Sequence, residues 1–149
     1  MLTGSVLFVC AANRCRSPLA MALLQRLVRE QQDEAMWRIE SAGLHAIPDL
    51  PVTPHVQTVA HEAGLDLSQH RSRSVDQLQL AEYTLVLTME EIQAEALASA
   101  YPLQAGTIRP FCTIVNLHVD IEDPTGYGLR EHRALMELLR RYLQAGLPR

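Results

Sequence analysis

Short apolar runs and longer amphipathic stretches alternate along the chain, and this alternation predicts its secondary structure. Ser5–Val9 is a continuous apolar run, which is typical of a strand buried on both faces. Ser17 and Pro18 follow as the N-cap and the first residue of a predicted helix. Apolar residues then recur at helical spacing, at Leu19, Ala20, Leu23, Leu24, Leu27 and Val28. This segment therefore predicts one strand followed by one helix.

The same alternation continues to the C-terminus. Further strands are predicted at residues 37–41 and 83–87, and a weaker one at residues 107–110. Two helices have N-terminal signals, one at Thr53-Pro54 with a C-cap at Gly64 and one at Thr88 to Glu91, which have capping-box spacing. A last helix follows an acidic loop at residues 116–128, with its buried stripe at Leu135, Met136, Leu138, Leu139, Tyr142 and Leu143.

Strands that alternate with helices form a parallel sheet, because right-handed crossovers place the helices on its faces. We therefore predict an α/β fold in which residues 1–149 form a single three-layer domain. Its sheet is four-stranded, parallel and twisted, with helices on both faces, which is a flavodoxin-like arrangement. Ligands bind at the carboxyl ends of the strands in such sheets, where the strand order reverses. The loop after the first strand is the first place to expect a site.

Composition and charge narrow the chemistry. The chain has 149 residues, 48% of them hydrophobic and 20% charged, which suits one folded domain and excludes a disordered or fibrous protein. The net charge of −4 gives no basic footprint for nucleic acid or an anionic membrane. All 13 basic residues are Arg, which excludes a Lys nucleophile, a Schiff base and a Walker-type Lys. Arginine must therefore supply any cation that the chemistry needs.

The cysteines and the N-terminal residues indicate the cellular compartment in which the protein is expected. Cys10, Cys15 and Cys112 are an odd and sparse set, a poor disulfide framework for a secreted domain. The chain begins without the basic region and long apolar run of a signal peptide, and no segment is apolar over a membrane-spanning length. We expect a cytoplasmic protein with free thiols, and we expect Cys112 to lie in the core.

The loop from Cys10 to Pro18 has the composition of a phosphate-binding loop that carries a nucleophile. Successive backbone N–H groups can surround an anion, and the start of the following helix adds a positive dipole. Arg16 can donate two parallel hydrogen bonds to phosphate oxygens. The same positive field favours the thiolate form of Cys10, which would attack phosphorus.

We therefore predict Cys10 and Arg16 as catalytic residues. The rest of the phosphate-binding loop would be Ala11, Ala12, Asn13, Arg14, Cys15 and Ser17. The alternative is an inert cysteine at the end of a buried strand. The position of the loop, between a strand and a helix start at the switch point of the sheet, favours the catalytic interpretation.

Five segments in the right order resemble one family, the low-molecular-weight protein tyrosine phosphatases. They are Val9–Pro18, Glu40–Leu44, His70–Arg73, Leu85–Glu90 and Asp123-Pro124. The resemblance covers almost the whole chain and is strongest to the bacterial branch that works beside exopolysaccharide tyrosine kinases. It implies a phosphoric monoester hydrolase with the phosphotyrosine protein phosphatase I type of fold.

Hydrolysis of a tyrosyl phosphate needs a proton donor, because phenolate is a poor leaving group at neutral pH. Residues 120–124 offer three carboxylates, at Asp120, Glu122 and Asp123, which alone would suggest only a solvated acidic loop. The family resemblance selects Asp123 as the acid. The implied mechanism is a double displacement: Cys10 attacks phosphorus, Arg16 and the loop amides hold the oxygens, and Asp123 protonates the leaving oxygen. Asp123 would then act as the base for the water that hydrolyses the phosphocysteine.

The resemblance also implies a supporting network. Asn13, Ser17, Ser41 and His70 would fix the phosphate-binding loop, and the Ser17 hydroxyl would also stabilise the Cys10 thiolate. From the residues alone, Asn13 suits a left-handed turn, Ser17 suits an N-cap, and His70 would be an ordinary surface histidine.

Two roles are open for Cys15. By resemblance, it can form a reversible disulfide with Cys10 that protects the nucleophile from over-oxidation. Equally, it can be a packed thiol in the loop.

No metal or other cofactor is expected, because the proposed chemistry needs none and the histidines lack metal-ligand spacing. His55 and His61 are six residues apart, which does not align them on one helix face. His45, His118 and His132 are expected to be solvated.

The sequence departs from the family around the entrance of the site. Ala12 stands where Gly is usual, which would strain the loop if that position needs a positive φ. Arg14 replaces an apolar or small residue, and would attract acidic residues that flank a phosphotyrosine or select another phosphorylated substrate. Thr125 follows Asp123-Pro124 where an aromatic is usual, and the nearest aromatic is Tyr127. We predict that Leu44, Arg14 and Tyr127 line the entrance.

Other functions remain open on this scaffold. A thioredoxin-coupled arsenate reductase needs two further thiols near residues 80–90, where the chain has none. A phosphoarginine phosphatase conflicts with the positive charge of Arg14, and a phosphate-binding or phosphocarrier module would not need Asp123. The favoured partner is a phosphotyrosine-containing protein, such as a tyrosine kinase or an exopolysaccharide-synthesis protein. The chain itself is expected to be a monomer or weak dimer that does not insert into membranes.

Overall fold

The computed structural model describes residues 4–147. Four strands and four α-helices alternate along this part of the chain, with short 3₁₀ helices between them. They are β1 (Gly4–Cys10), α1 (Arg16–Glu30), β2 (Trp37–Gly43), α2 (Pro54–Glu62), β3 (Leu85–Thr88), α3 (Glu91–Ala100), β4 (Ile108–Pro110) and α4 (Leu129–Gly146). The 3₁₀ helices are Glu34–Met36, Val75–Gln77, Leu80–Glu82, Pro102–Thr107 and Phe111–Val115.

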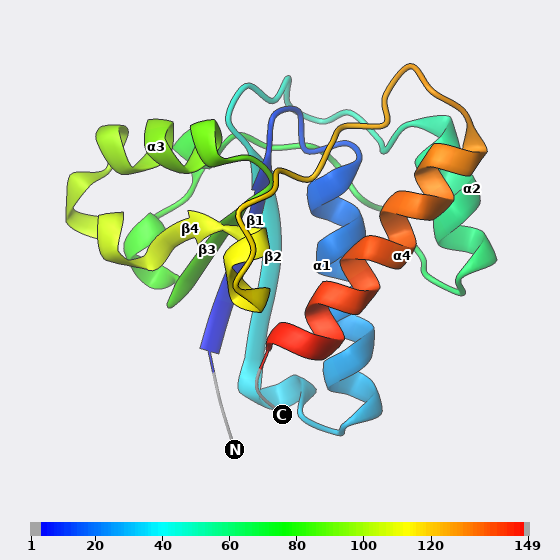
Figure 1. Cartoon of the computed structure of the whole chain (residues 1–149), viewed down its shortest axis with the longest axis horizontal. Coiled ribbons are helices and arrows are strands. Elements are labelled where there is room, and N and C mark those ends of the chain that lie inside the picture. Colours follow the sequence, from blue (N-terminus) through cyan, green and yellow to red (C-terminus); the bar gives the residue numbers. More distant parts are fainter. Residues whose placement is uncertain (1–3, 148–149) are drawn as a thin grey trace.

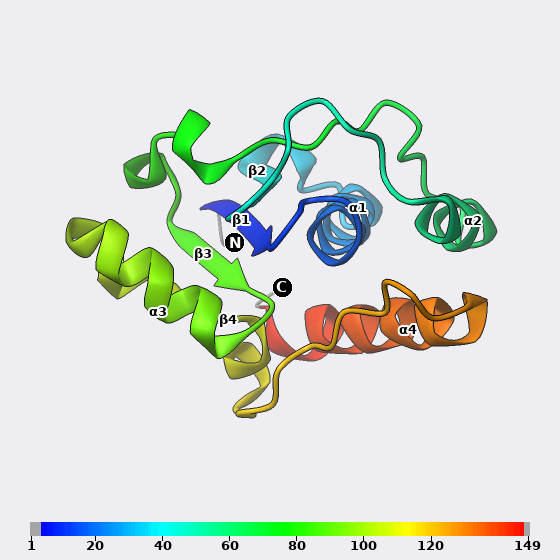
Figure 2. The ribbon, with the colours of Figure 1, turned by 90° about the horizontal axis from the view of Figure 1, so that it is seen from above.

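The four strands form one parallel sheet in the order β2-β1-β3-β4. Figure 2 shows three layers, with α3 on one side of the sheet and α1, α2 and α4 on the other. The predicted fold class is therefore confirmed. The order reverses next to β1, because β2 and β3 lie on its two sides, so the loop after β1 follows the switch point.

The core is divided by the sheet, and β1 contributes to both halves. Val6, Phe8 and Cys10 belong to the cluster that includes α1, α2 and α4, whereas Leu7 and Val9 belong to the cluster that includes α3. Successive side chains of a strand point to opposite faces, so a run without polar residues is needed where both faces are covered. Along the described chain, no helix combines the length and the apolar character needed to cross a membrane.

The functional loops gather at one edge of the sheet. Because all four strands are parallel, the loops after β1 and β2 and the start of α3 leave the sheet at the same end. The long loop between Val115 and α4, residues 116–128, crosses this end as well (Figure 1). The sheet thus brings the Cys10 loop and the carboxylates of residues 120–123 together although more than a hundred residues separate them in sequence.

Two predicted helix caps were wrong. Helix α1 begins at Arg16, so Ser17 lies in its first turn, and its hydroxyl is turned inward to the Cys10 thiol. Helix α3 begins at Glu91, and its capping box is formed by Glu90 and Gln93. The Thr88 hydroxyl instead donates to the Glu90 carbonyl. At Ser17 the contact with Cys10 overrides the local signal, whereas Thr88 is the last residue of β3, so the helix begins only after it.

The histidine prediction was wrong at one position. His132 is 2% exposed rather than solvated. Its Nδ1 lies 2.8 Å from the carbonyl of Gly128, and its ring packs against His55 with centroids 5.0 Å apart. His45 and His118 are exposed, as predicted.

Candidate active site

Cys10 is the last residue of β1, and its side chain is buried on the α1 side of the sheet. The Ser17 Oγ lies 3.0 Å from the Cys10 Sγ. Because the Ser17 Oγ also accepts a hydrogen bond from the Asn13 amide, its own hydrogen can go to the Cys10 sulfur at 3.0 Å or to the Ala42 carbonyl oxygen, which is farther away at 3.4 Å. This arrangement provides a hydrogen-bond donor for a thiolate at Cys10.

Asn13 is the centre of the loop. It is fully buried, and its backbone is left-handed, with a φ of 58°. Its Nδ2 donates to the hydroxyls of Ser17 and Ser41, both at 2.9 Å, and its Oδ1 accepts from the Arg73 amide at 3.1 Å. Ala12 is not among the residues with positive φ, so the replacement of Gly there causes no strain of that kind.

His70 supports the same residue from the other side. Its Nε2 lies 2.8 Å from the Asn13 carbonyl, which can only accept, so Nε2 carries the hydrogen. Burial lowers the pKa of His70, and the nearby Arg73 and Arg71 lower it further, against the opposite effect of the Asn13 carbonyl. His70 is therefore neutral at neutral pH. The structure thus brings Asn13, Ser17, Ser41 and His70 into one network.

Gly43, the last residue of β2, allows the loop to pass close by. A Cβ at this position would lie 2.6 Å from the Ala11 carbonyl oxygen and 3.0 Å from the Asn13 amide nitrogen. Both contacts are to backbone atoms, which cannot rotate away. Any side chain at residue 43 would therefore displace the phosphate-binding loop.

The Arg16 guanidinium is buried and held on one side only. Its Nη1 donates to Glu90 Oε2 at 2.7 Å and to the Ile121 carbonyl at 2.6 Å, which uses both hydrogens of that nitrogen. Within residues 4–147, neither Nε nor Nη2 makes a hydrogen bond to the protein. These two nitrogens present the parallel pair of donors that binds a phosphoryl group.

Asp123 faces this guanidinium from the loop before α4. Its Oδ2 lies 3.8 Å from Arg16 Nη2, and its side chain is 46% exposed. Its other oxygen, Oδ1, accepts hydrogen bonds from the amide and the hydroxyl of Thr125. A group bound between Cys10 and Arg16 would therefore lie beside a carboxyl that also reaches solvent.

Charged side chains around Glu40, a residue of β2, support the network. The Glu40 carboxylate accepts hydrogen bonds from Arg38, Arg73 and the Tyr83 hydroxyl. Burial alone would raise the pKa of Glu40, but these three donors lower it to about 2. Arg73 also donates from Nε to the Ser41 carbonyl, so Glu40 orients a residue that contacts both Ser41 and Asn13.

Cys15 is a buried residue of the loop, and only 6% of it is exposed. Burial raises its pKa to about 12, and the nearby Asp123 and Cys10 add to this effect, whereas Arg16 opposes it. At neutral pH Cys15 is therefore a protonated thiol, which is the weaker nucleophile. Both loop cysteines are free, and the protective disulfide stays a prediction.

Arg14 connects the loop to the segment before α2. Its Nε donates to the Pro51 carbonyl at 2.8 Å, and its carbonyl accepts from the Thr53 amide at 3.2 Å. Leu44, which follows β2, is partly buried and packs against the core on the α3 side. Both residues lie at the edge of the sheet that carries the loop, and their role at the entrance stays a prediction.

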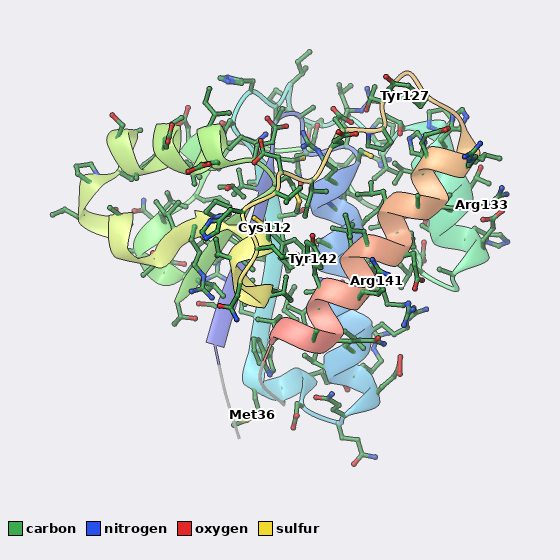
Figure 3. The ribbon with its side chains drawn as sticks, in the orientation of Figure 1. Met36, Cys112, Tyr127, Arg133, Arg141 and Tyr142 are labelled. Atoms are coloured by element: carbon green, nitrogen blue, oxygen red, sulfur yellow. The ribbon has the colours of Figure 1, made fainter. Side chains whose placement is uncertain are left out.

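Tyr127 lies in the loop that leads into α4 and is 66% exposed (Figure 3). It lines a groove of about 470 Å³ between residues 119–124 and α4, and no residue of the phosphate-binding loop lines that groove. Its contribution to the entrance also stays a prediction.

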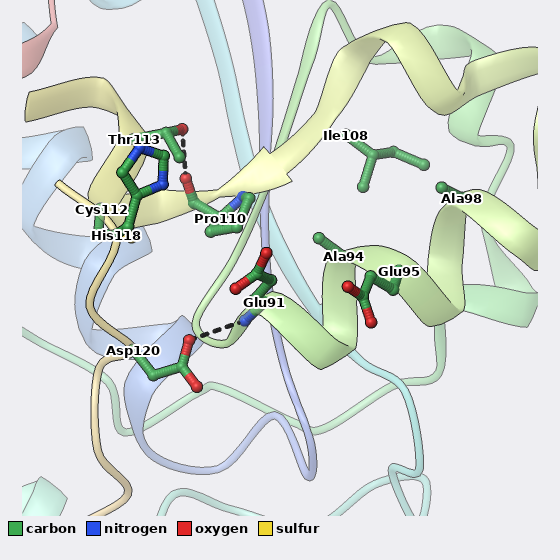
Figure 4. A pocket seen from close by; sticks show the side chains of 10 residues that line it. All are labelled: Glu91, Ala94, Glu95, Ala98, Ile108, Pro110, Cys112, Thr113, His118 and Asp120. Carbon is green, nitrogen blue, oxygen red and sulfur yellow. Dashed lines mark hydrogen bonds between the residues drawn. The ribbon is translucent and has the colours of Figure 1, made fainter. Parts of the chain in front are cut away.

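A separate groove of about 330 Å³ lies between α3 and β4 (Figure 4). Cys112, which is buried as predicted, lines it together with His118, Asp120, Glu91 and Glu95. Asp120 accepts a hydrogen bond from the Glu91 amide across its end. Although these are metal-ligand types, residues 4–147 contain no group of three or more such side chains placed to hold a metal ion.

Sequence reasoning missed Glu90, Arg73 and Gly43 as functional residues. Each belongs to a segment that carries the family resemblance, but no local pattern reveals its partner. A clearer signal was available for Glu90, because it comes two residues after the end of β3, the strand next to β1, and must lie at the edge that carries Cys10.

Comparisons with known proteins agree with this geometry. The family model described as "Low molecular weight phosphotyrosine protein phosphatase" matches residues 5–147. The chain is 34% identical over 138 residues to the low molecular weight protein-tyrosine-phosphatase Wzb of Escherichia coli K12, covering 93% of this chain and 89% of Wzb. It is 28% identical over 145 residues to the probable phosphatase EpsP of Ralstonia nicotianae, covering 97% and 94%.

Solved structures give the same result for the fold. The low molecular weight protein tyrosine phosphatase of T. tengcongensis superposes with a TM-score of 0.88 at 32% identity, covering 95% of each chain. The YwlE arginine phosphatase of Geobacillus stearothermophilus superposes with a TM-score of 0.84 at 27% identity, covering 95% of this chain and 89% of YwlE. Structures described as acting on two different phosphorylated residues thus share this fold.

Proposed function

Since the chain belongs to the low molecular weight phosphotyrosine protein phosphatase family, we propose that it hydrolyses phosphotyrosine in proteins through a phosphocysteine on Cys10. The observation that carries this proposal is the buried Arg16 guanidinium. Glu90 and Ile121 hold its Nη1, so Nε and Nη2 are directed to bind two phosphoryl oxygens beside the Cys10 sulfur.

The first half-reaction transfers the phosphoryl group to sulfur. The Cys10 thiolate, supported by the Ser17 hydroxyl, attacks phosphorus while Arg16 and the loop amides bind the equatorial oxygens. The bond between phosphorus and the tyrosyl oxygen breaks, its electron pair goes to that oxygen, and Asp123 supplies a proton. The products are phosphocysteine, a free tyrosine and an ionised Asp123.

The second half-reaction restores the enzyme. Asp123 takes a proton from a water molecule, whose oxygen bonds to phosphorus, and the electron pair of the S–P bond returns to Cys10. The 46% exposure of the Asp123 side chain supports this step, because water must reach the carboxylate. The network around Asn13 keeps the loop in one shape through both steps.

We further propose a bacterial tyrosine kinase or another exopolysaccharide-synthesis protein as the substrate, in the cytoplasm. The resemblance to the bacterial branch of the family and the three free thiols support this assignment. The similarity to an arginine phosphatase supports a second candidate, phosphoarginine. The positive charge of Arg14 at the loop opposes it, because a guanidinium substrate would be repelled.

The test compares a phosphotyrosyl and a phosphoarginyl peptide of the same sequence in the presence of EDTA. We expect kcat/KM to be higher for phosphotyrosine by roughly 10-fold or more, and we expect Cys10→Ser to abolish turnover. Cys112→Ala is the matched control, because it removes a buried thiol outside the loop. A preference for phosphoarginine would assign the second candidate instead, and turnover by Cys10→Ser would refute the phosphocysteine mechanism.

A further inference from the structure

Thr125 makes two hydrogen bonds to one oxygen of the proposed acid. Its amide donates to Asp123 Oδ1 at 3.0 Å and its hydroxyl donates to the same atom at 2.7 Å. Asp123 Oδ2 has no such donor, and it lies toward Arg16, 3.8 Å from Nη2. The two oxygens of this carboxyl group therefore have different surroundings.

This difference decides where a proton can lie. A neutral carboxyl group has one hydroxyl oxygen and one carbonyl oxygen. A hydrogen on Oδ1 would oppose the Thr125 amide, which can only donate, and would force the Thr125 hydroxyl to change from donor to acceptor, so the neutral acid carries its hydrogen on Oδ2. That oxygen faces Arg16, which holds the phosphoryl group, so the proton is on the side where the leaving oxygen forms.

We infer that Thr125 is a positioning residue for proton transfer, whose hydroxyl keeps Oδ1 as the acceptor and Oδ2 as the proton donor of Asp123. The inference rests on the proposed function, in which Asp123 is the general acid. During the first half-reaction the Oδ2 proton moves to the leaving oxygen as the P–O bond breaks. In the second half-reaction Oδ2 receives a proton from water as the new P–O bond forms.

Little else orients this carboxyl group. Within the described residues, its other polar contact is the 3.8 Å approach of Arg16, and its side chain is 46% exposed. Gly126, with a φ of 92°, and the hydrogen bond from the Tyr127 amide to the Pro124 carbonyl close the turn around Thr125. An aromatic residue at position 125 would keep the hydrogen bond from its backbone amide to Asp123, but it would have no hydroxyl on its Cβ. The hydrogen bond from the Thr125 hydroxyl to Asp123 is therefore one that an aromatic residue at this position could not make.

The test uses Thr125→Val, which removes the hydroxyl at constant shape, and Thr125→Ser, which retains it. The kcat/KM values of a series of aryl phosphates report the first half-reaction, and poor leaving groups depend most on the acid. For Thr125→Val we expect kcat/KM to fall about 10-fold for phenyl phosphate and to change less than about twofold for 2,4-dinitrophenyl phosphate, since one hydrogen bond to a charged group is lost. Thr125→Ser should remain within about twofold of the parent for both substrates.

Thr58→Val is the matched control, because Thr58 also donates from its hydroxyl, to the Pro54 carbonyl in α2, far along the chain from the site. The inference is overturned if Thr125→Val lowers kcat/KM equally for all leaving groups, or leaves all of them unchanged, while Asp123→Asn still penalises the poor leaving groups. If Asp123→Asn shows no dependence on the leaving group, the acid assignment fails and the inference fails with it. Loss of activity in Cys10→Ser is independent of both results and tests the proposed function separately.

Discussion

The two loops that form the site are held in different ways. The phosphate-binding loop is fixed by buried groups, and Asn13 contacts four residues, which are Ser17, Ser41, His70 and Arg73. In the acid loop, residues 120–127, the Asp123 side chain is exposed, and its carboxyl depends on its neighbour Thr125 and a distant approach to Arg16.

The difference follows from what each loop has to do. Donors that bind a phosphoryl group act without reorganisation only if they are fixed before the substrate arrives, so their partners are buried. A proton donor that later activates water must stay accessible, so a buried network would hinder it. We therefore expect changes in the phosphate-binding loop to affect both stability and activity, and changes at the Asp123 carboxyl to affect activity alone.

Asn13→Ala, in the phosphate-binding loop, should cause the largest loss of both stability and activity. It removes three side-chain hydrogen bonds, leaves the partly buried Arg73 amide without its acceptor and places Ala at a φ of 58°. We expect the free energy of unfolding to fall by about 3 kcal/mol, which lowers the Tm by roughly 10 °C in a chain of this size, and kcat/KM to fall about 100-fold.

Asp123→Asn is the matched change in the acid loop. It keeps the shape of the side chain but removes the proton donor, so kcat/KM for phenyl phosphate should also fall about 100-fold. Its Tm should stay within roughly 2 °C of the parent, because the side chain is exposed. Thermal unfolding and kinetics on the two variants make the comparison, and equal losses of stability would contradict it.

The sequence alone predicts much of the phosphate-binding loop but less of the loop that carries Asp123. The phosphate-binding loop is predictable because its nucleophile, its cation and its helix start lie within the nine residues Cys10–Pro18. Strand β1 is predictable because both its faces are covered. Asp123 could be selected among three neighbouring carboxylates only through the family resemblance, since its partner Arg16 is distant in sequence.

The errors have a common cause. Ser17 has the right identity for an N-cap, but its hydroxyl meets Cys10 and Asn13, which only the folded loop brings to it. His132 lies on the α4 face that contacts α2, and the sequence of α4 alone does not show which helix covers it. Glu40, Arg73 and Tyr83 form a hub from three separated segments, so no local pattern could identify it.

Glu40 and its three donors predict a smaller effect, on how the free energy of unfolding depends on pH. Because three donors lower the pKa of Glu40 from 4.5 to about 2, the unfolded chain binds more protons than the folded one between these values. Stability from this group is present above about pH 5 and is lost as the pH falls toward 2. Between these limits we expect the free energy of unfolding to fall by about 2 kcal/mol less in Glu40→Gln than in the parent.

The measurement is urea unfolding at a series of pH values. Glu95→Gln is the control, because Glu95 is exposed on α3 and makes no ion pair within the described residues. A Glu40→Gln variant with the acid sensitivity of the parent would show that the hub does not stabilise the fold around the loop.

The central claim is that Cys10 accepts the phosphoryl group, and rapid acid quench with a phosphotyrosyl peptide tests it most directly. In Asp123→Asn the leaving group must depart without an acid, so 2,4-dinitrophenyl phosphate replaces the peptide for this variant. Because the variant also lacks the base for the second half-reaction, one phosphate per chain should accumulate on Cys10 and be located there by mass spectrometry. Cys112→Ala should trap the same group on Cys10 when combined with Asp123→Asn. Steady turnover with no phosphate on Cys10 at any quench time, or phosphate on another residue, would contradict the account.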